Sequence, residues 1–299
     1  MTQRRVVTLP TLPSLGGLYA GAVASSARIA ASRAARGGGA APVLPGTEVR
    51  VAGVGTGGMA AHLRDYQRVV REPASDVLPA GFLHALAFPL SMAVMTRRDF
   101  PLPPLGMVHI ANDVAVSRPV LLGDELEVRA WAENLRPHRR GVTADFTAEI
   151  RVAGELAWRG VSTYLAKGVS TGERAPERAE ESAWSPPLPT GRWALPAHTG
   201  RAYGAVSGDR NPIHMSALAA RAFGFPCAIA HGMYTAARAL AEVGPARGES
   251  FRWTVEFAKP VLLPGTVDVA ITRTGEGFAF AGWNGRRGTK HFAGAVTPP

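Results

Sequence analysis

Cysteine and long apolar runs are scarce in this 299-residue chain, and each scarcity excludes a class of protein. Cys227 stands alone, which excludes an intramolecular disulfide and a cysteine-based zinc site. No stretch reaches the roughly 18 consecutive apolar residues that a membrane-spanning helix needs. The eight histidines show no pair at metal-ligand spacing with a carboxylate partner. We therefore expect a protein of the reducing cytoplasm, without a membrane span, a metal or a resident cofactor.

Positive charge is in excess, because 33 Lys and Arg residues against 23 Asp and Glu residues give a formal net charge of +10. The basic residues are scattered among Ala, Gly and Pro. They form no stripe interleaved with aromatic residues, and no helix-turn-helix or RNA-binding motif is present. The pattern argues against a nucleic-acid partner and favours an acidic or phosphorylated one.

The length favours two modules of about 120 to 150 residues each. Residues 168–196 are the clearest boundary, since they are rich in Ser, Thr, Glu, Arg and Pro and have no apolar period. We predict an N-terminal extension over 1–45, a first module over 46–167, a linker over 168–196 and a second module over 197–299.

The extension contains an alanine-rich stretch that Arg28, Arg33 and Arg36 interrupt too often for the apolar core of a signal peptide. We predict a helix there, followed by a flexible glycine run at 37–39. An organellar transit peptide is the alternative interpretation.

The two modules resemble each other, because RPVLLG at 118–123 and KPVLLPG at 259–265 each precede an alternating strand. Residues 65–70 are likewise echoed by 202–207. Each half predicts a strand, a helical stretch, one long apolar helix and four strands with period-two patterning. The predicted long helices cover 84–95 and 231–243, and the strands that follow them cover 108–116, 125–132, 142–152, 155–165, 251–258, 267–272, 278–283 and 291–296. Strands that follow one another in the chain predict antiparallel sheets and an α+β fold. Because each long helix is apolar nearly all round, a sheet must wrap it.

The strongest local signal is YGAVSGDRNPIH at 203–214. Its Gly-Asp-x-Asn-Pro core is turn chemistry, which presents Asp209 and His214 as neighbours at the start of a helix. One interpretation is that the segment is only a turn. The other is that a carboxylate beside an imidazole, whose reference pKa is about 6.5, holds and deprotonates a water near neutral pH.

Residues 229–233 open the second long helix. The unsatisfied N–H groups of a helix N-terminus suit a carbonyl oxygen that becomes negative, and Gly232 would let a ligand approach its N–H closely. A base and an oxyanion donor together are what proton transfer next to a carbonyl requires. We interpret His231 as a histidine packed in the core rather than as a residue that acts directly in catalysis. For Gly232, the alternative interpretation is that it only begins the helix and binds no ligand.

Together these residues resemble the R-specific enoyl-thioester hydratase motif of the MaoC-like proteins, and the likeness continues through FAKPV at 257–261. The first half, at 86–89 and 132–141, is similar to the double-hot-dog 3-hydroxyacyl-thioester dehydratases of actinobacterial fatty-acid metabolism. The resemblance covers the chain from about residue 47 onward. It implies a double hot-dog fold of class α+β, in which two antiparallel sheets each wrap a long central helix and are fused as a pseudo-dimer.

The resemblance also implies reversible hydration of trans-2-enoyl thioesters to (3R)-hydroxyacyl thioesters, carried by coenzyme A or acyl carrier protein. Asp209 and His214 would share the catalytic water, Asn211 would orient the site, and the N–H of Gly232 would bind the thioester oxygen. The expected substrate-binding residues are Gly232, Asn211, Ser207 and Tyr203. Ala237 is a departure, since some single-module relatives carry serine at that position.

The first half lacks this machinery. Aligning Tyr66 with Tyr203 places Glu72, Ala74 and Val77 where the second half has its Asp, Asn and His. We therefore expect the first half to be catalytically silent and to shape the acyl-chain tunnel. A homodimer of such pseudo-dimers is one expected assembly.

Other functions compete with this one. The glycine run at 53–58 matches the dinucleotide fingerprint and precedes Asp76 by about 20 residues, but the preceding strand alternates polar residues and no second βαβ unit follows. A nicotinamide oxidoreductase is thus disfavoured. A non-catalytic acyl-thioester binding protein or a hot-dog thioesterase would share the fold, because fold does not decide function. Cys227, in an apolar context without a partner base, is not expected to be a nucleophile.

Overall fold

The computed structural model describes residues 4–36, 41–175 and 184–299. Its helices are α1 (Leu15–Arg36), η1 (Gly57–Met59), α2 (Ala60–Val70), α3 (Ala80–Met95), η2 (Pro104–Gly106), α4 (Thr199–Ser207), α5 (Pro212–Met215), α6 (Ala217–Ala222), α7 (Gly232–Val243) and η3 (Gly244–Arg247). Its strands are β1 (Arg5–Thr8), β2 (Thr47–Gly55), β3 (Met107–Val116), β4 (Glu125–His138), β5 (Gly141–Val152), β6 (Glu155–Lys167), β7 (Gly191–Leu195), β8 (Phe251–Phe257), β9 (Gly265–Thr274), β10 (Gly277–Asn284) and β11 (Thr289–Thr297). No helix among these is both long and apolar enough to cross a membrane.

The chain divides into two compact units, each assembled from three segments. The first unit comprises Met1–Gly55, Leu86–Asn112 and Glu125–Glu180, and the second comprises Thr56–Ala85, Asp113–Asp124 and Glu181–Pro299. Strand β3 and helix α3 therefore run from one unit into the other.

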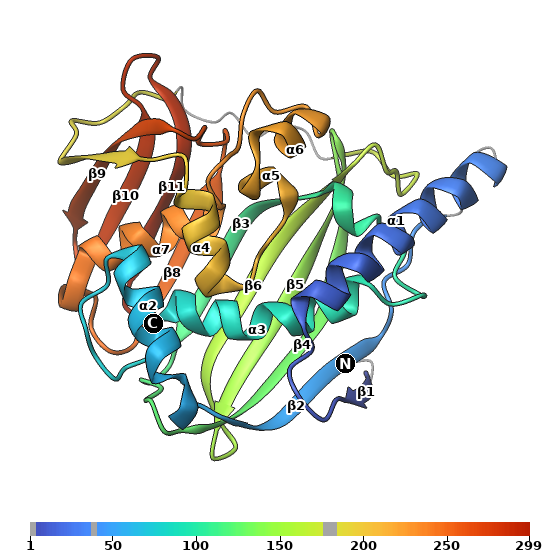
Figure 1. Ribbon diagram of the computed structural model, residues 1–299, viewed down its shortest axis with the longest axis horizontal. Coiled ribbons are helices and arrows are strands. Elements are labelled where there is room, and N and C mark those ends of the chain that lie inside the picture. Colours follow the sequence, from blue (N-terminus) through green and yellow to red (C-terminus); the bar gives the residue numbers. More distant parts are fainter. Residues whose placement is uncertain (1–3, 37–40, 176–183) are drawn as a thin grey trace. The chain divides into compact units, whose positions relative to one another are not determined.

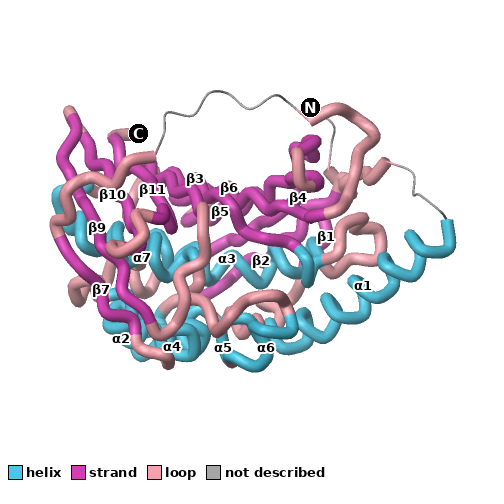
Figure 2. The backbone as a smooth tube through the Cα atoms, turned by 90° about the horizontal axis from the view of Figure 1, so that it is seen from above, coloured by secondary structure: helices cyan, strands magenta, loops and turns pink. Residues whose placement is uncertain are grey.

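The strands of the first unit lie in the order β1-β2-β4-β5-β6, and from β2 to β6 each strand is antiparallel to the next in that series. Along β5, Ala144, Phe146 and Ile150 point to one face and are buried, as period-two patterning predicts. The part of α3 in this unit, from Leu86, is apolar and mostly buried, and it crosses the strands β4 to β6 (Figures 1 and 2). A helix with no polar face has to be covered in this way.

The N-terminal extension contributes more than a helix to this unit. Helix α1 confirms the predicted alanine-rich helix, and the glycine run at 37–39 lies outside the described residues. Strand β1 was not expected: it pairs in parallel with β2, and Arg4 beside it forms an ion pair with Glu133 at 2.6 Å. Four residues of RVVT are too few for sequence periodicity to distinguish a strand from a loop.

The second unit repeats the plan with strands in the order β8-β11-β10-β9-β7, all antiparallel. Helix α7 lies against β8, β9 and β11 and against α2, and it is buried along most of its length. Every predicted strand and both predicted long helices are present, many of them longer than predicted. Helix α3, for example, begins at Ala80, directly after Pro79, rather than at residue 84.

Strand β7 lies inside the predicted linker 168–196. It pairs with β9, and its side chains Trp193 and Leu195 are buried. The alternation of a large apolar residue at every second position is the local reason for the strand, although five residues among prolines gave too short a pattern to locate the opening strand of the second half in this range. Residues 176–183 of the predicted linker lie outside the described residues.

The two copies of the repeat detected in the sequence, at 65–70 and 202–207, lie in contact within the second unit. Helices α2 and α4 are in contact, and the rings of the equivalent residues Tyr66 and Tyr203 lie 6.2 Å apart. By contrast, the glycines at 53–58 do not open a dinucleotide-binding unit: β2 pairs antiparallel with β4, and its parallel neighbour β1 precedes it in the chain. Among the described strands, β2 is thus not followed by a right-handed βαβ crossover.

Candidate active site

The turn between α4 and α5 places a carboxylate, and its backbone follows from the residue types. Helix α4 ends at Gly208, which adopts the left-handed φ of +75° that glycine tolerates. The N–H of Asp209 then donates to Ser207 Oγ at 3.2 Å, and the N–H of Asn211 donates to Asp209 Oδ1 at 3.1 Å. Asn211 caps α5 by accepting from Ile213 N at 3.4 Å. The turn chemistry predicted from the sequence is confirmed.

His214 lies on the short helix that follows this turn, and it is buried. Its Nδ1 donates to the backbone carbonyl of Ile229 at 2.8 Å, so that Nε2 carries the lone pair. Gly200 of α4 packs directly on the His214 backbone, because a Cβ there would lie 2.1 Å from the His214 carbonyl oxygen. Burial lowers the pKa of the His214 imidazole, while the charge of Asp209 and the bond to Ile229 oppose that shift.

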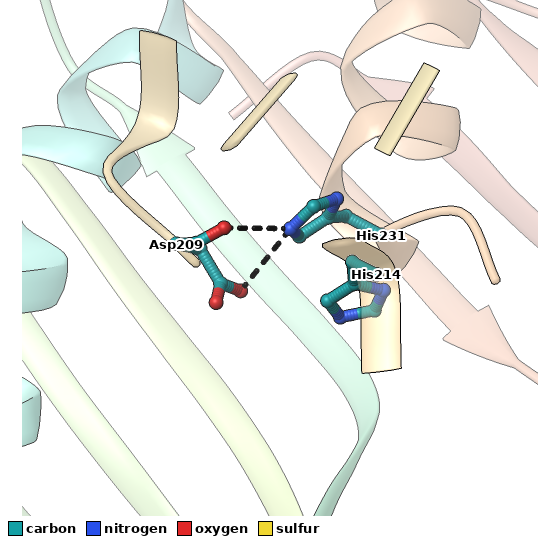
Figure 3. Close-up of side chains that lie close together, drawn as sticks. All are labelled: Asp209, His214 and His231. Atoms are coloured by element: carbon teal, nitrogen blue, oxygen red, sulfur yellow. Dashed lines mark hydrogen bonds and ion pairs between the residues drawn. The ribbon is translucent and has the colours of Figure 1, made fainter. Parts of the chain in front are cut away.

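His231 joins these two residues (Figure 3). Its Nε2 donates to the backbone carbonyl of Asp209 at 2.9 Å and lies 3.8 Å from the Asp209 carboxylate. Its ring stacks on that of His214, with centroids 3.7 Å apart and planes at 26°. Burial, reinforced by His214, lowers the pKa of His231 to about 3, with Asp209 opposing. The sequence predicted a packed histidine here, and this neutral, packed ring in fact touches both candidate catalytic residues.

The arrangement can hold a water and move its proton. Asp209 is a partly exposed carboxylate, and His214 offers an unprotonated nitrogen at neutral pH. Asp209, His214 and His231 also offer ligand atoms within 4.8 Å of one another, as a metal site would. A cation held by all three would have to displace the bond from His231 Nε2 to Asp209, since that nitrogen carries a hydrogen.

Tyr203 and Ser207 were predicted to bind substrate, and the structure places both in contact with the site residues. The Tyr203 ring is buried, 5.0 Å from the His231 ring and 5.7 Å from that of Tyr234. Burial raises the pKa of the Tyr203 phenol, which is therefore neutral. The Ser207 hydroxyl accepts from Asp209 N. Direct contact of either residue with substrate stays a prediction.

Gly232 begins α7 next to His231, as predicted, but its lack of a side chain has a second reason. A Cβ at this position would lie 2.9 Å from the ring of Phe257 on β8. The helix start and the strand can approach this closely only with glycine between them. The N–H of Gly232 belongs to the first turn of the helix, where no carbonyl of the same helix is available.

Gly232→Ala should therefore lower the thermal stability as well as the activity. Pushing the Phe257 ring aside should reduce the free energy of unfolding by about 1 to 3 kcal/mol, measured by chemical denaturation. The double variant Gly232→Ala/Phe257→Leu should regain the stability that Gly232→Ala loses, because the smaller leucine leaves room for the added methyl group. Any activity that this double variant still lacks is then due to blocked access of the ligand to the N–H of residue 232. Gly57→Ala is the matched control, because a Cβ there meets nothing within 4 Å. Wild-type stability in Gly232→Ala alone would contradict the packing argument.

His84 is a residue that sequence reasoning did not single out. It lies on α3, one turn after Gly81, where a Cβ would be 3.1 Å from that of Ala237 on α7. Burial lowers the pKa of His84 to about 4, and the negative charge of Asp209 acts against that shift. Its proximity to Asp209 arises from helix packing, so no local motif signals it. The same close approach favours a small side chain at Ala237, the position where some single-module relatives carry serine.

Comparisons with known proteins point to one family. Residues 185–294 match the family model described as a MaoC like domain. The chain is 37% identical over 238 residues to 3-hydroxyacyl-thioester dehydratase X of Mycobacterium tuberculosis, covering 79% of this chain and 84% of that protein. The crystal structure of HtdX from the same organism matches with a TM-score of 0.75 at 33% identity, over 84% of this chain and 100% of that one.

A MaoC-like dehydratase from Phytophthora capsici shares the fold, with a TM-score of 0.64 at 18% identity over 84% of this chain and 95% of that one. The predicted α+β double hot-dog fold is confirmed. With the sequence identity to the mycobacterial dehydratase and the MaoC match, these findings show that the chain belongs to the family of MaoC-like 3-hydroxyacyl-thioester dehydratases.

Proposed function

We propose that this chain catalyses the reversible hydration of trans-2-enoyl thioesters to (3R)-hydroxyacyl thioesters, with Asp209 and His214 as the catalytic pair. The observation that carries the proposal is the state of His214. Its Nδ1–H is bonded to the Ile229 carbonyl and its pKa is lowered by burial, so Nε2 is a free base beside a carboxylate. The family to which the chain belongs supports the same chemistry.

In the hydration direction, Asp209 accepts a hydrogen bond from one O–H of the water, and His214 Nε2 takes the proton of the other O–H. The water oxygen bonds to C3 of the substrate, and the electron pair of the 2,3-double bond moves toward the thioester carbonyl. The N–H of Gly232 stabilises the enolate oxygen that develops. The protonated imidazole then returns its proton to C2, so that one water is added in total. Dehydration follows the same steps in reverse.

The substrate carrier in this proposal is coenzyme A or acyl carrier protein. Both are anionic, which the net charge of +10 favours. Arg210, adjacent to Asp209, is exposed and provides a cation near the site. No metal or nicotinamide is needed for the reaction as written.

We also propose that the first half of the chain holds no second catalytic pair. Glu72, at the position that aligns with Asp209, forms an ion pair with Arg247 at 2.5 Å. Val77, which aligns with His214, forms a β-bridge with Leu121. Both residues are thus used structurally in the second unit. His84 nevertheless brings an imidazole from the first half of the sequence into the electrostatic range of Asp209.

The test is to add crotonyl-CoA and a series of longer trans-2-enoyl-CoAs to the enzyme in the presence of EDTA. We expect the absorbance of the conjugated thioester to fall and chiral chromatography to show the R product. A thiol reagent run in parallel distinguishes the competing functions. Release of free coenzyme A would indicate a thioesterase, and binding without any change in absorbance would indicate a carrier of acyl thioesters. Either result would replace the proposed function.

A further inference from the structure

His231 occupies the N-cap position of α7 without acting as a cap. Its backbone is extended there, with φ −63° and ψ 137°, and its side chain accepts no hydrogen bond from the N–H groups of the first turn. Residues at this position usually satisfy such an N–H with a side-chain oxygen. The imidazole instead points toward the turn that carries Asp209 (Figure 3).

Residue 231 is a histidine although one of its ring nitrogens is unsatisfied among the described residues. Nδ1 of His231 is buried and has no hydrogen-bond partner among the described residues. A buried polar atom without a partner costs about 1 to 3 kcal/mol, and a phenylalanine of similar shape would avoid that loss. Packing alone therefore does not account for a histidine, whereas the bond from Nε2 to the Asp209 carbonyl does.

That bond fixes the main chain of Asp209. Asp209 N already donates to Ser207 Oγ and its Oδ1 accepts from Asn211 N within the turn, so the backbone carbonyl is a further point at which the residue is held. The other carboxylate oxygen, Oδ2, lies 3.8 Å from His231 Nε2. The position of the carboxylate relative to His214 thus depends on His231.

The ring of His231 also covers His214. With centroids 3.7 Å apart, the two rings exclude water from one face of the His214 imidazole. The other titratable groups around the pair are Asp209 on the turn, Tyr203 on α4 and, acting on Asp209, His84 on α3. The pKa of His231 lies so low that it stays neutral, and it adds no charge of its own to the site.

We propose that His231 is a positioning residue for the reaction, which sets the Asp209 carboxylate through its Nε2 and shields His214 through its ring. The inference rests on the proposed function for its kinetic consequences, but its second part, the shielding of His214, can be tested without substrate. Each part predicts a different result for a different substitution.

His231→Phe keeps the ring and removes the donor. We expect kcat to fall about tenfold, the effect of one hydrogen bond of about 1.4 kcal/mol, while the acid limb of kcat/KM stays at the same pH. His231→Gln keeps a donor and removes the ring. Water then reaches His214, so the pKa of His214 should rise toward 6.5. Because His214 acts as a base only when neutral, the acid limb should move to higher pH.

The second measurement uses 15N-labelled histidine and follows the His214 ring nitrogens by NMR as the pH is changed, without substrate. We expect His231→Phe to titrate like the wild type and His231→Gln to titrate at higher pH. His138→Gln, on the β4–β5 hairpin, is the control and should change neither readout.

A merely structural role predicts a different pattern. Both His231 variants would then melt at lower temperature while kcat per folded molecule and the titration of His214 stayed as in the wild type, and this would overturn the inference. If the wild type hydrates no enoyl thioester but the NMR titrations separate as expected, the proposed function fails and the shielding of His214 by the His231 ring stands. If the wild type is active and His231→Phe matches it in kcat, the positioning role fails alone.

Discussion

Replacing His214 with alanine should lower the turnover of an enoyl thioester by at least about a hundredfold, which is the scale of general acid–base catalysis. The side chain that is lost supplies the only unprotonated ring nitrogen that our mechanism uses to accept the proton of the water. The residual rate would come from the Asp209 carboxylate and from substrate binding. Initial rates at saturating crotonyl-CoA, corrected for the folded fraction by circular dichroism, give the comparison.

The matched control is His138→Ala, which removes an imidazole from the β4–β5 hairpin of the first unit, where its Nδ1 accepts from the Arg140 backbone N–H. It should turn over substrate like the wild type. Less than a tenfold loss in His214→Ala would mean that another group accepts the proton, and His84 would be the first candidate to replace next.

Asp209→Asn should have an effect of similar size for a different reason. Asparagine can still accept from Asn211 N through its amide oxygen, so the turn should be retained. What disappears is the negative charge that holds the water and favours the protonated form of His214 during the reaction. The pKa of His214 should also fall further, because the charge of Asp209 now raises it. The acid limb of the remaining activity should therefore shift to lower pH.

Glu72→Gln is the control for that variant, since Glu72 aligns with Asp209 in the first half of the chain. It should leave kcat nearly unchanged when assayed well below its melting temperature, although loss of the ion pair with Arg247 should lower the stability slightly. A comparable loss of kcat in Glu72→Gln would contradict the proposal that the first half is catalytically silent.

Local chemistry made much of the site predictable from the sequence. The pattern Gly-Asp-x-Asn-Pro specifies its own turn, so Asp209 and His214 were expected to be neighbours, and Asn211 was expected to organise them. The alternating strands and the two apolar helices were likewise evident, because their periods extend over many residues. Short elements such as β1 and β7 lacked enough residues to show a period.

Contacts between distant segments could not be predicted in this way. The bond from His214 to Ile229, the stacking of His231 and the approach of His84 all depend on how helices pack. Gly232 illustrates the difference: the sequence indicated a helix start open to a ligand, whereas the contact with Phe257 is a property of the folded sheet.

The unit that contains the proposed catalytic pair is not a continuous stretch of polypeptide, because it includes Thr56–Ala85 and Asp113–Asp124. In it, the His62 ring bonds to the Val206 carbonyl at 2.6 Å, and Tyr66 packs between Phe82 and Tyr203. A fragment that began at the MaoC match would leave this face of α4 exposed to solvent. Expressing the second half alone should therefore yield an aggregation-prone product, because the unit folds only when both halves are present in one chain.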